Sequence, residues 1–332
     1  MSRYYRPLVQ HGTARPDGAV PLAGQSLWFT HAEALSRDGA SQVVAAADIP
    51  ADVLQRLSRP RAALSGLDIA RPHIMGILNT TPDSFSDGGI HSSVEAARAG
   101  ALEMVSRGAT ILDIGGESTR PGADFVPADE EITRTRPVIE AIRAETNALI
   151  SIDTRKTAVA KAACEAGAGL VNDVSGFTFD PELAPFCAGL GAPVCVMHMQ
   201  GDPATMQDNP VYENVVLDVY DFLAGQIERL EALGLNRDLI IVDPGIGFGK
   251  TEDHNLVLLR NLSLFHGLGC PILLGVSRKG FIGSIGQEPR KTARAPGSIA
   301  VALDGLSQGV QIIRVHDVAE TAQALRLWAA VR

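Results

Sequence analysis

The chain has 332 residues, of which 45% are hydrophobic and 20% charged, so it can bury a sizeable core in one or two domains. Its formal charge of −9 argues against a nucleic-acid-binding protein, which normally carries a basic surplus, and no apolar run approaches the roughly 18–20 residues of a membrane helix. The segment from Met1 to Pro21 is polar and contains arginine, with no stretch that could serve as a signal peptide, so we expect a cytoplasmic protein.

Residues 1–68 show no regular period. They carry scattered glycine and proline, one short amphipathic helix candidate at Ile49–Leu57, and a possible short strand pair around Leu64–Ile69. We predict a small N-terminal extension whose last part covers the bottom of the domain that follows. Its role is not legible from the sequence.

From Pro72 onward, short apolar or β-branched runs alternate with stretches at helical period. The runs are His73–Leu78, Thr110–Ile114, Leu149–Ile152, Leu170–Val174, Val194–Met197, Leu239–Val242, Ile272–Gly275 and Gln311–Val315. The helical stretches lie near 93–107, 128–145, 156–166, 181–190, 211–233, 253–266, 292–308 and 317–331. Continuous apolar strands separated by helices indicate a parallel sheet covered on its outside. Eight such units predict an α/β fold, a (β/α)₈ TIM barrel over residues 69–332, rather than a doubly wound open sheet.

Nearly every predicted strand ends on polar or charged side chains. They are Asn79, Glu117 with Arg120, Asp153, Asn172 with Asp173, His198, Asp243, Ser277 with Arg278 and Lys279, and Arg314 with His316. One such residue could simply cap a helix, but a set that converges on one end of a barrel indicates an active site, because the chemistry of TIM barrels lies where strands run out into loops.

These strand-end residues form two groups. Asp153, Asn172, Asp243 and Lys279 would make a buried ring of acceptors and donors suited to a flat heterocycle with many N–H and C=O groups. A second group, Arg314, His316 and Asn79, comes from the last and first strands, which are neighbours in a closed barrel. With a helix N-terminus near Asp317, this corner resembles a site for phosphate or pyrophosphate.

Other motifs have simpler structural explanations. Asp243–Thr251 resembles a phosphate-binding loop, but the position that requires its first glycine is Pro244, so the glycines are better explained by a tight turn beside a ligand. The four cysteines form no CxxC pair, which is typical of buried free thiols. No nucleophile pattern occurs at usable positions, which favours a reaction that orients two substrates without a covalent enzyme intermediate. Loops 79–89 and 115–122 have the composition of lids that order over ligands.

Eight segments from about Leu67 to the C-terminus resemble dihydropteroate synthase. They are MGILNTTPDSFSDGG (75–89), DIGGESTRPGA (113–123), SIDTRK (151–156), NDVSG (172–176), VMHMQG (196–201), DPGIGFGK (243–250), GVSRKGFIG (275–283) and IIRVHDV (312–318). The resemblance implies that the amine of p-aminobenzoate displaces pyrophosphate from 6-hydroxymethyl-7,8-dihydropterin pyrophosphate in folate biosynthesis. It also implies assistance by Mg²⁺ and pairing of the barrels as a homodimer.

The resemblance also implies roles for individual residues. The pterin would meet Asp153, Asn172, Asp243 and Lys279, with Met197, Phe248 and Gly275 as walls. Arg314 and His316 would hold the pyrophosphate, and Asn79 with Asp87 would meet Mg²⁺. Phe85, Thr119, Arg120, Pro121 and Ser277 would frame p-aminobenzoate. Asp153, Asp243, Lys279, Arg314 and His316 are the expected catalytic set.

The chain departs from the family in one of these segments, and rival functions remain open. Many relatives read Asp-Thr-Ser-Lys-Pro where this chain has Asp153-Thr-Arg155-Lys-Thr157, so the start of the following helix can differ. One rival is a pterin-binding methyltransferase with a corrinoid partner, which would not need loops 79–89 and 115–122. The other is a non-catalytic pterin-binding paralogue, which loss of a lid residue would favour.

Overall fold

The core of the molecule is a parallel sheet closed on itself. The computed structural model describes residues 3–80, 89–118, 124–202 and 205–332, with the backbone alone in 89–93. Its eight parallel strands are β6 (His73–Asn79), β7 (Ile111–Gly115), β8 (Leu149–Asp153), β9 (Leu170–Asp173), β10 (Val194–Met197), β11 (Ile240–Asp243), β12 (Leu273–Leu274) and β13 (Ile312–Val315). They pair in the order β11-β10-β9-β8-β7-β6-β13-β12, and a parallel bridge between Val242 and Ile272 brings the two ends of the sheet together. The predicted (β/α)₈ barrel is confirmed.

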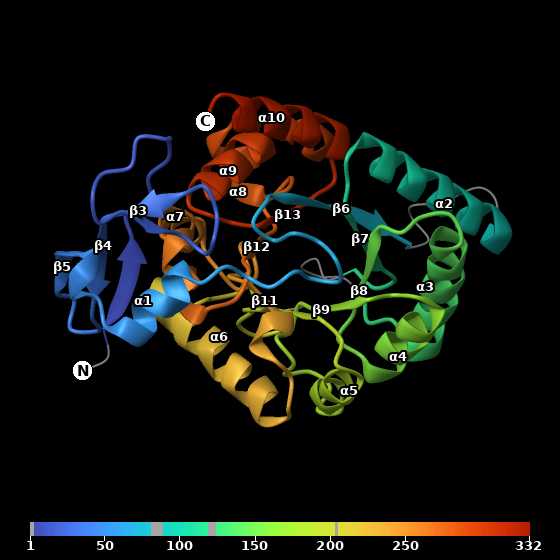
Figure 1. Ribbon diagram of the computed structural model, residues 1–332. Helices are drawn as coiled ribbons and strands as arrows, with labels where there is room; N and C mark the ends of the chain where they lie inside the picture. Colours follow the sequence, from blue (N-terminus) through green and yellow to red (C-terminus); the bar gives the residue numbers. More distant parts are fainter. Residues whose placement is uncertain (1–2, 81–88, 119–123, 203–204) are drawn as a thin grey trace.

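Helices surround this sheet on its outer side (Figure 1). They are α2 (Gly89–Arg107), α3 (Ala128–Arg143), α4 (Thr157–Ala166), α5 (Leu183–Leu190), α6 (Val215–Ala232), α7 (Glu252–Arg260), α9 (Ala295–Ser307) and α10 (Val318–Ala330), with a short α8 (Gly280–Ile285) before α9. Several predicted helix bounds differ by a few residues, and two of these differences are informative. The helix expected from 211 begins at Val215, because the Asn214 side chain caps the backbone N–H groups of Val216 and Leu217. The helix expected to reach 266 ends at Arg260 and continues as the 3₁₀ turn η4 (Leu262–Leu268).

The lower half of the barrel interior is filled by apolar side chains. Ile111, Leu170, Ile241 and Ile312 are fully buried members of one cluster. Leu64 and Ile69 belong to the same cluster, so the residues just before β6 close the bottom of the barrel, as predicted. The upper half therefore holds the only inward-facing positions left for polar chemistry on these strands.

The N-terminal region folds as a small module on one side of the barrel (Figure 1). Its sheet pairs β1 (Tyr4–Pro7), β4 (His31–Leu35) and β5 (Ser41–Ala45) in antiparallel fashion, beside the pair β2 (Val20–Pro21) and β3 (Trp28–Phe29). The turn η1 (Ala46–Asp48) and helix α1 (Ala51–Ser58) complete it around a separate apolar core. Only α1 was foreseen, because strands of two to five residues leave little periodic signal.

The module is fixed to the barrel by specific contacts. β1 and α1 pack against η4, and the Tyr4 hydroxyl donates to the Asp221 carboxylate of α6 at 2.9 Å.

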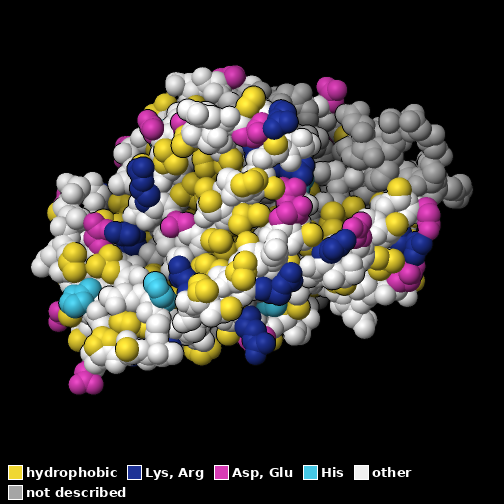
Figure 2. Space-filling view, turned by 90° about the horizontal axis from the view of Figure 1, so that it is seen from above, with side chains coloured by type: hydrophobic (Ala, Val, Ile, Leu, Met, Phe, Trp, Pro, Cys, Tyr) yellow, Lys and Arg dark blue, Asp and Glu magenta, His cyan; other side chains and the backbone are white. Residues whose placement is uncertain are grey.

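Basic and acidic side chains are interspersed on the face of the protein seen in Figure 2. Among the described residues, no helix combines the length and the apolar character needed to cross a membrane.

Candidate active site

Four side chains from different strands meet inside the barrel at the carboxyl ends of the strands. Arg314 on β13 donates from Nε to Asp113 Oδ2 at 2.5 Å and from a terminal nitrogen to Asp153 Oδ2 at 2.7 Å. Asn172 on β9 donates from Nδ2 to the same Asp113 oxygen at 3.2 Å. The parallel register aligns β7, β8 and β9, so residues far apart in sequence converge here.

This cluster holds more acceptor capacity than the described residues use. Oδ1 of Asp113 and Oδ1 of Asp153 are both buried and have no hydrogen-bond partner in the described part of the chain. Burial outweighs the attraction of Arg314 and raises the pKa of Asp153 to about 7, and the neighbouring Asp113 pushes it in the same direction. Two buried carboxylate oxygens without a partner among the described residues call for a ligand that brings N–H donors.

Asp243 ends β11, four strands from β7 in the sheet order and at the same end of the barrel. Its Oδ1 accepts the backbone N–H of Gly245 at 2.7 Å, which fixes the carboxylate at the start of the loop to α7. Burial raises the pKa of Asp243, while this hydrogen bond and the nearby Lys279 oppose the rise. A Cβ at Gly275 would lie 3.8 Å from Asp243 Oδ2, so the absence of a side chain at Gly275 leaves room beside the carboxylate.

Aromatic and cationic groups lie near Asp243. The ammonium of Lys279 lies 4.1 Å from the centroid of the half-buried Phe248 ring, a cation–π arrangement. Met197 ends β10 and is 4% exposed. The structure therefore brings the residues expected to bind pterin to one end of one barrel: Asp153, Asn172, Met197, Asp243, Phe248, Gly275 and Lys279.

The expected phosphate corner differs in detail. His316 lies beside Ser277, with 2.9 Å between its Nδ1 and the Ser277 hydroxyl, which also accepts the His316 backbone N–H at 3.1 Å. Arg314 points to Asp113 and Asp153 instead of toward His316. Asp317 precedes α10 and is paired with Arg278, so this corner contains an acid as well as cations.

Part of the predicted site cannot be placed. Phe85, Asp87, Thr119, Arg120 and Pro121 lie outside the described residues. Asn79 is described: it ends β6, is half-buried, and stands opposite Gly115 in the sheet. Its amide oxygen is a hard donor of the kind that Mg²⁺ accepts. In the described ranges, no group of three or more His, Cys, Asp or Glu residues could hold a metal ion.

Asp113 is a site residue that the sequence analysis did not predict. The residue was included in the predicted strand Thr110–Ile114, whose strand-end residues were taken to be Glu117 and Arg120. Asp113 faces the barrel interior, is fully buried, and bonds to both Arg314 and Asn172. Its site role could have been predicted from a carboxylate in the middle of an apolar strand, because burying an unpaired charge there is energetically unfavourable.

A buried ion cluster lies just beyond the end of β7, around Glu117. Glu117 accepts from Arg155 at 3.2 Å and pairs with Lys156 at 3.0 Å, and Lys156 also pairs with Glu131 at 2.6 Å. The second Glu117 oxygen accepts the backbone N–H of Val126 at 3.0 Å. Arg155, which departs from the family pattern, is thus a buried partner of Glu117 and leaves the neighbouring Asp153 in place.

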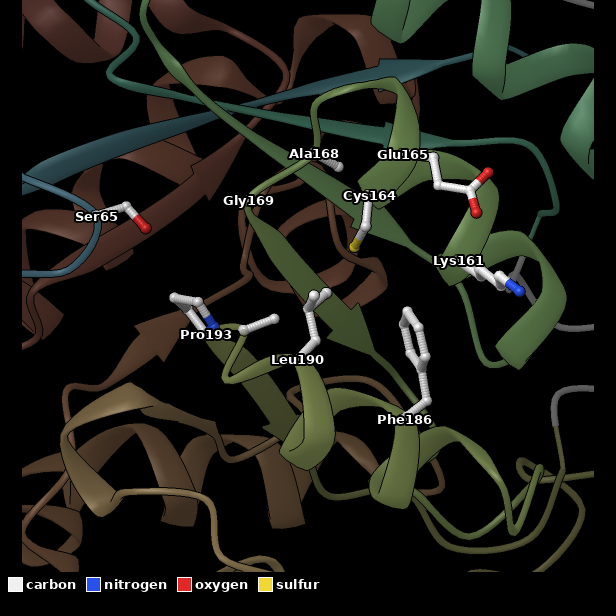
Figure 3. Close-up of a pocket in the computed structure, with 10 residues that line it drawn as sticks. Ser65, Lys161, Cys164, Glu165, Ala168, Gly169, Phe186, Leu190 and Pro193 are labelled. Atoms are coloured by element: carbon white, nitrogen blue, oxygen red, sulfur yellow. The ribbon is translucent and has the colours of Figure 1, made fainter.

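A cavity of about 540 Å³ lies far from this mouth, between α4 and α5 (Figure 3). Its lining is mostly apolar, with the Cys164 thiol, Phe186 and Leu190 around the space. Lys161 and Glu165 are its charged lining residues. Because no set of polar groups converges there, we place the chemistry at the carboxyl ends of the strands, where Asp113, Asp153, Asp243, Lys279 and Arg314 meet.

Comparisons with known proteins point to one family. The family described as "Pterin binding enzyme" matches residues 75–316. Dihydropteroate synthase of Escherichia coli is 46% identical over 263 residues, which cover 79% of this chain and 93% of that protein. The Haemophilus influenzae enzyme is 46% identical over 264 residues, covering 80% and 95%.

Solved structures give the same result. Xanthomonas albilineans dihydropteroate synthase with 4-aminobenzoic acid superposes with a TM-score of 0.77 at 45% identity, covering 82% of this chain and 98% of that one. The same enzyme in complex with 7,8-dihydropteroate gives 0.74 at 42% identity, with the same coverage. With the family match, the close relatives and the barrel-mouth cluster in agreement, the chain belongs to the dihydropteroate synthase family of pterin-binding enzymes.

Proposed function

We propose that this chain joins 6-hydroxymethyl-7,8-dihydropterin pyrophosphate to p-aminobenzoate, giving 7,8-dihydropteroate and pyrophosphate in folate biosynthesis. The observation that carries the proposal is the buried cluster of Asp113, Asp153, Asn172 and Arg314, in which two carboxylate oxygens lack partners among the described residues. A pterin ring carries N–H groups that would satisfy them. The solved relatives that contain 4-aminobenzoic acid and 7,8-dihydropteroate support one substrate and the product.

The pterin would lie between two carboxylates. Asp243 would accept hydrogen bonds from the amino-pyrimidine edge, and Asp153 with Asn172 would meet the other polar edge. Phe248, Met197 and the open position at Gly275 would border the ring. A positive charge that develops on the pterin as the leaving group departs would be stabilised by Asp243 and Asp153, because both are held in a buried, preorganised site.

The leaving group would be stabilised at the other side of the mouth. Arg314 and His316 would contact the pyrophosphate, and Lys279 would add positive charge nearby. Asn79 and Asp87 would hold Mg²⁺, and the ion, when bound, supplies neutralising charge for the phosphate oxygens. One or two protein oxygens are enough for Mg²⁺ when phosphate oxygens and water complete its coordination.

The reaction is a substitution at the exocyclic carbon of the pterin. The C–O bond to pyrophosphate breaks with its electron pair on the departing oxygen, the amine nitrogen of p-aminobenzoate forms the new C–N bond, and the amine releases one proton. Ser277 would contact p-aminobenzoate together with Phe85, Thr119, Arg120 and Pro121. The Ser277–His316 contact, 2.9 Å long, would link the p-aminobenzoate side to the pyrophosphate side. The chain's contribution is therefore positioning and electrostatic stabilisation.

A pyrophosphate-release assay tests the proposal. With the pterin pyrophosphate and Mg²⁺, release should require p-aminobenzoate and should match the dihydropteroate formed. Pterin binding without release would indicate a non-catalytic paralogue. Methyl transfer from methyltetrahydrofolate to a corrinoid protein, with no release, would indicate the methyltransferase instead.

Three further proposals concern the oligomeric state, the cellular compartment and the N-terminal segment. We propose that the enzyme acts as a homodimer, that it works in the cytoplasm, and that residues 1–68 are an N-terminal extension whose last part closes the bottom of the barrel of residues 69–332. Light scattering on the purified chain tests the dimer. A truncation that starts at residue 60 would keep the barrel plug at Leu64 and Ile69 and would show whether the module is needed for turnover.

A further inference from the structure

Lys250 is a buried lysine that the proposed chemistry does not use. It ends the loop between β11 and α7 and is 3% exposed. Its Nζ lies 2.8 Å from His198 Nδ1, 2.9 Å from the carbonyl oxygens of Gly245 and Phe248, and 3.3 Å from the His198 carbonyl oxygen. An ammonium carries three protons, so these acceptors satisfy all of them. A buried cation without such acceptors would be strongly unfavourable.

The protonation states of this pair follow from their surroundings. Burial, followed by the nearby charge of Lys250, lowers the pKa of His198 to about 2, so its ring is neutral and Nδ1 is free to accept. Burial lowers the pKa of Lys250 to about 7, Lys279 acts in the same direction, and Asp243 opposes both. Lys250 is therefore the donor, and His198, Asp243 and Lys279 are the titratable groups that face it.

The loop that Lys250 holds lies directly on the chain after β10. Gly245 has φ +68°, and a Cβ there would fall 1.9 Å from the His198 carbonyl oxygen. Gly249 has φ +60°, and a Cβ there would fall 2.5 Å from the Gln200 carbonyl oxygen. Glycine is required at both positions, and the close approach places the Gly245 and Phe248 carbonyls around one ammonium.

Two of the three carbonyls that Lys250 binds, those of Gly245 and Phe248, belong to residues next to the proposed pterin site. Gly245 donates its N–H to Asp243 Oδ1 at 2.7 Å, and the Phe248 ring lies 4.1 Å from the Lys279 ammonium. We infer that Lys250 is a positioning residue: it locks loop 244–250 onto His198 and so fixes the Asp243 carboxylate and the Phe248 ring against the pterin. This inference rests on the proposed function. Lys250 is also the lysine of the segment that resembles a phosphate-binding loop. In this protein it binds protein carbonyls and His198.

The test compares Lys250→Met with wild type and with Lys161→Met. Methionine keeps the length of the side chain but donates no hydrogen bond, and Lys161 is an exposed lysine on α4 that provides the matched control. Calorimetry with 6-hydroxymethylpterin should show at least ~10-fold weaker binding for Lys250→Met, the size expected for a hydrogen bond to a charged group. The Michaelis constant for p-aminobenzoate, at saturating pterin pyrophosphate, should change less than about twofold, and Lys161→Met should match wild type.

A pH series separates positioning from a merely structural role. Deprotonation of Lys250 removes one donor, so wild-type affinity for 6-hydroxymethylpterin should fall as the pH rises above about 7. Lys250→Met should lack this decline. Unchanged pterin affinity in Lys250→Met, or the same decline in both proteins, would overturn the inference.

Two further variants keep the test decisive if Lys250→Met does not fold. His198→Asn keeps an acceptor near the Nδ1 position, whereas His198→Leu removes it. Pterin affinity should fall in the leucine variant alone, and equal affinities would overturn the inference. Asp243→Asn separates a wrong role for Lys250 from a wrong pterin site. If this variant binds pterin as wild type does, the proposed pterin site itself is wrong.

Discussion

The two halves of the barrel interior differ in chemistry although the same strands form them. At the bottom, the inward-facing residues include Ile111, Leu170, Ile241 and Ile312. Two positions further along the same strands stand Asp113, Asn172, Asp243 and Arg314. Side chains two apart on a strand point to the same face, so each of these four strands carries an apolar residue below and a polar one above.

On a single strand, the lower residue therefore contributes to stability and the upper residue to the proposed chemistry. The lower layer is dry and close-packed, and its residues contribute by burial alone. The upper layer contains acids whose pKa is raised by burial, namely Asp153 and Asp243, together with the cations Arg314 and Lys279. Substitutions at the two levels should therefore affect different measurements.

The largest effect is expected from the bottom layer. Ile241→Ala removes a fully buried side chain below the active site and should lower the free energy of unfolding by about 2–5 kcal/mol, from lost burial and the cavity left behind. Urea unfolding measures this. The kinetic constants of the folded fraction should remain those of wild type. A large rise in the Michaelis constant for the pterin would show that the two layers are not separable.

The second prediction concerns Asp243, two residues further along the same strand. Asp243→Asn removes the negative charge and one acceptor, so pterin affinity and turnover should fall together by at least ~10-fold, consistent with ~1.5–3 kcal/mol for a charged hydrogen bond. Calorimetry and steady-state kinetics measure the loss. The free energy of unfolding should change far less than in Ile241→Ala. Normal pterin binding would place the site elsewhere.

A third prediction uses the pKa of Asp153, which burial raises from its ordinary value of 3.8 to about 7. Between these values the folded protein binds a proton that the unfolded chain does not, so the Asp153 contribution to stability declines as the pH rises from about 4 to 7. Asp153→Asn should remove a slope of up to about 1.4 kcal/mol per pH unit. Urea unfolding at several pH values measures the difference between the two proteins. Parallel curves would contradict the prediction.

The smallest effect is expected at the start of α4, outside both layers. Asp180 accepts the backbone N–H of Thr157 at 2.8 Å, a bond that relatives with proline at this position cannot make. Asp180→Ala should cost about 0.5–1.5 kcal/mol of unfolding free energy and leave turnover unchanged. The control repeats Asp180→Ala in a Thr157→Pro chain, whose residue 157 has no backbone N–H to donate. The fold should accept this proline, because Lys156 has φ −118° and ψ 127°, which suits a residue before proline. In that background Asp180→Ala should cost less, and an equal cost would exclude the backbone bond as the cause.

The barrel was predictable because its signal is local and repeated. Each of the eight units carries a short apolar run followed by a helical stretch, and each strand end is marked by a polar residue. Strand periodicity then brings residues such as Asp153 and Asp243 to one end of the barrel. The N-terminal sheet has no such repetition, and its strands became visible only through their pairing.

The sequence by itself determined the barrel and its polar end, because these depend on patterns within single βα units. Only the tertiary structure decided which charges pair. Arg314 bonds to Asp113, 201 residues away, rather than facing His316. Arg155 is neutralised by Glu117, and Lys250 is held by His198, 52 residues earlier. A buried charge takes whichever partner the closed barrel brings within hydrogen-bonding distance, and no local pattern specifies that distance.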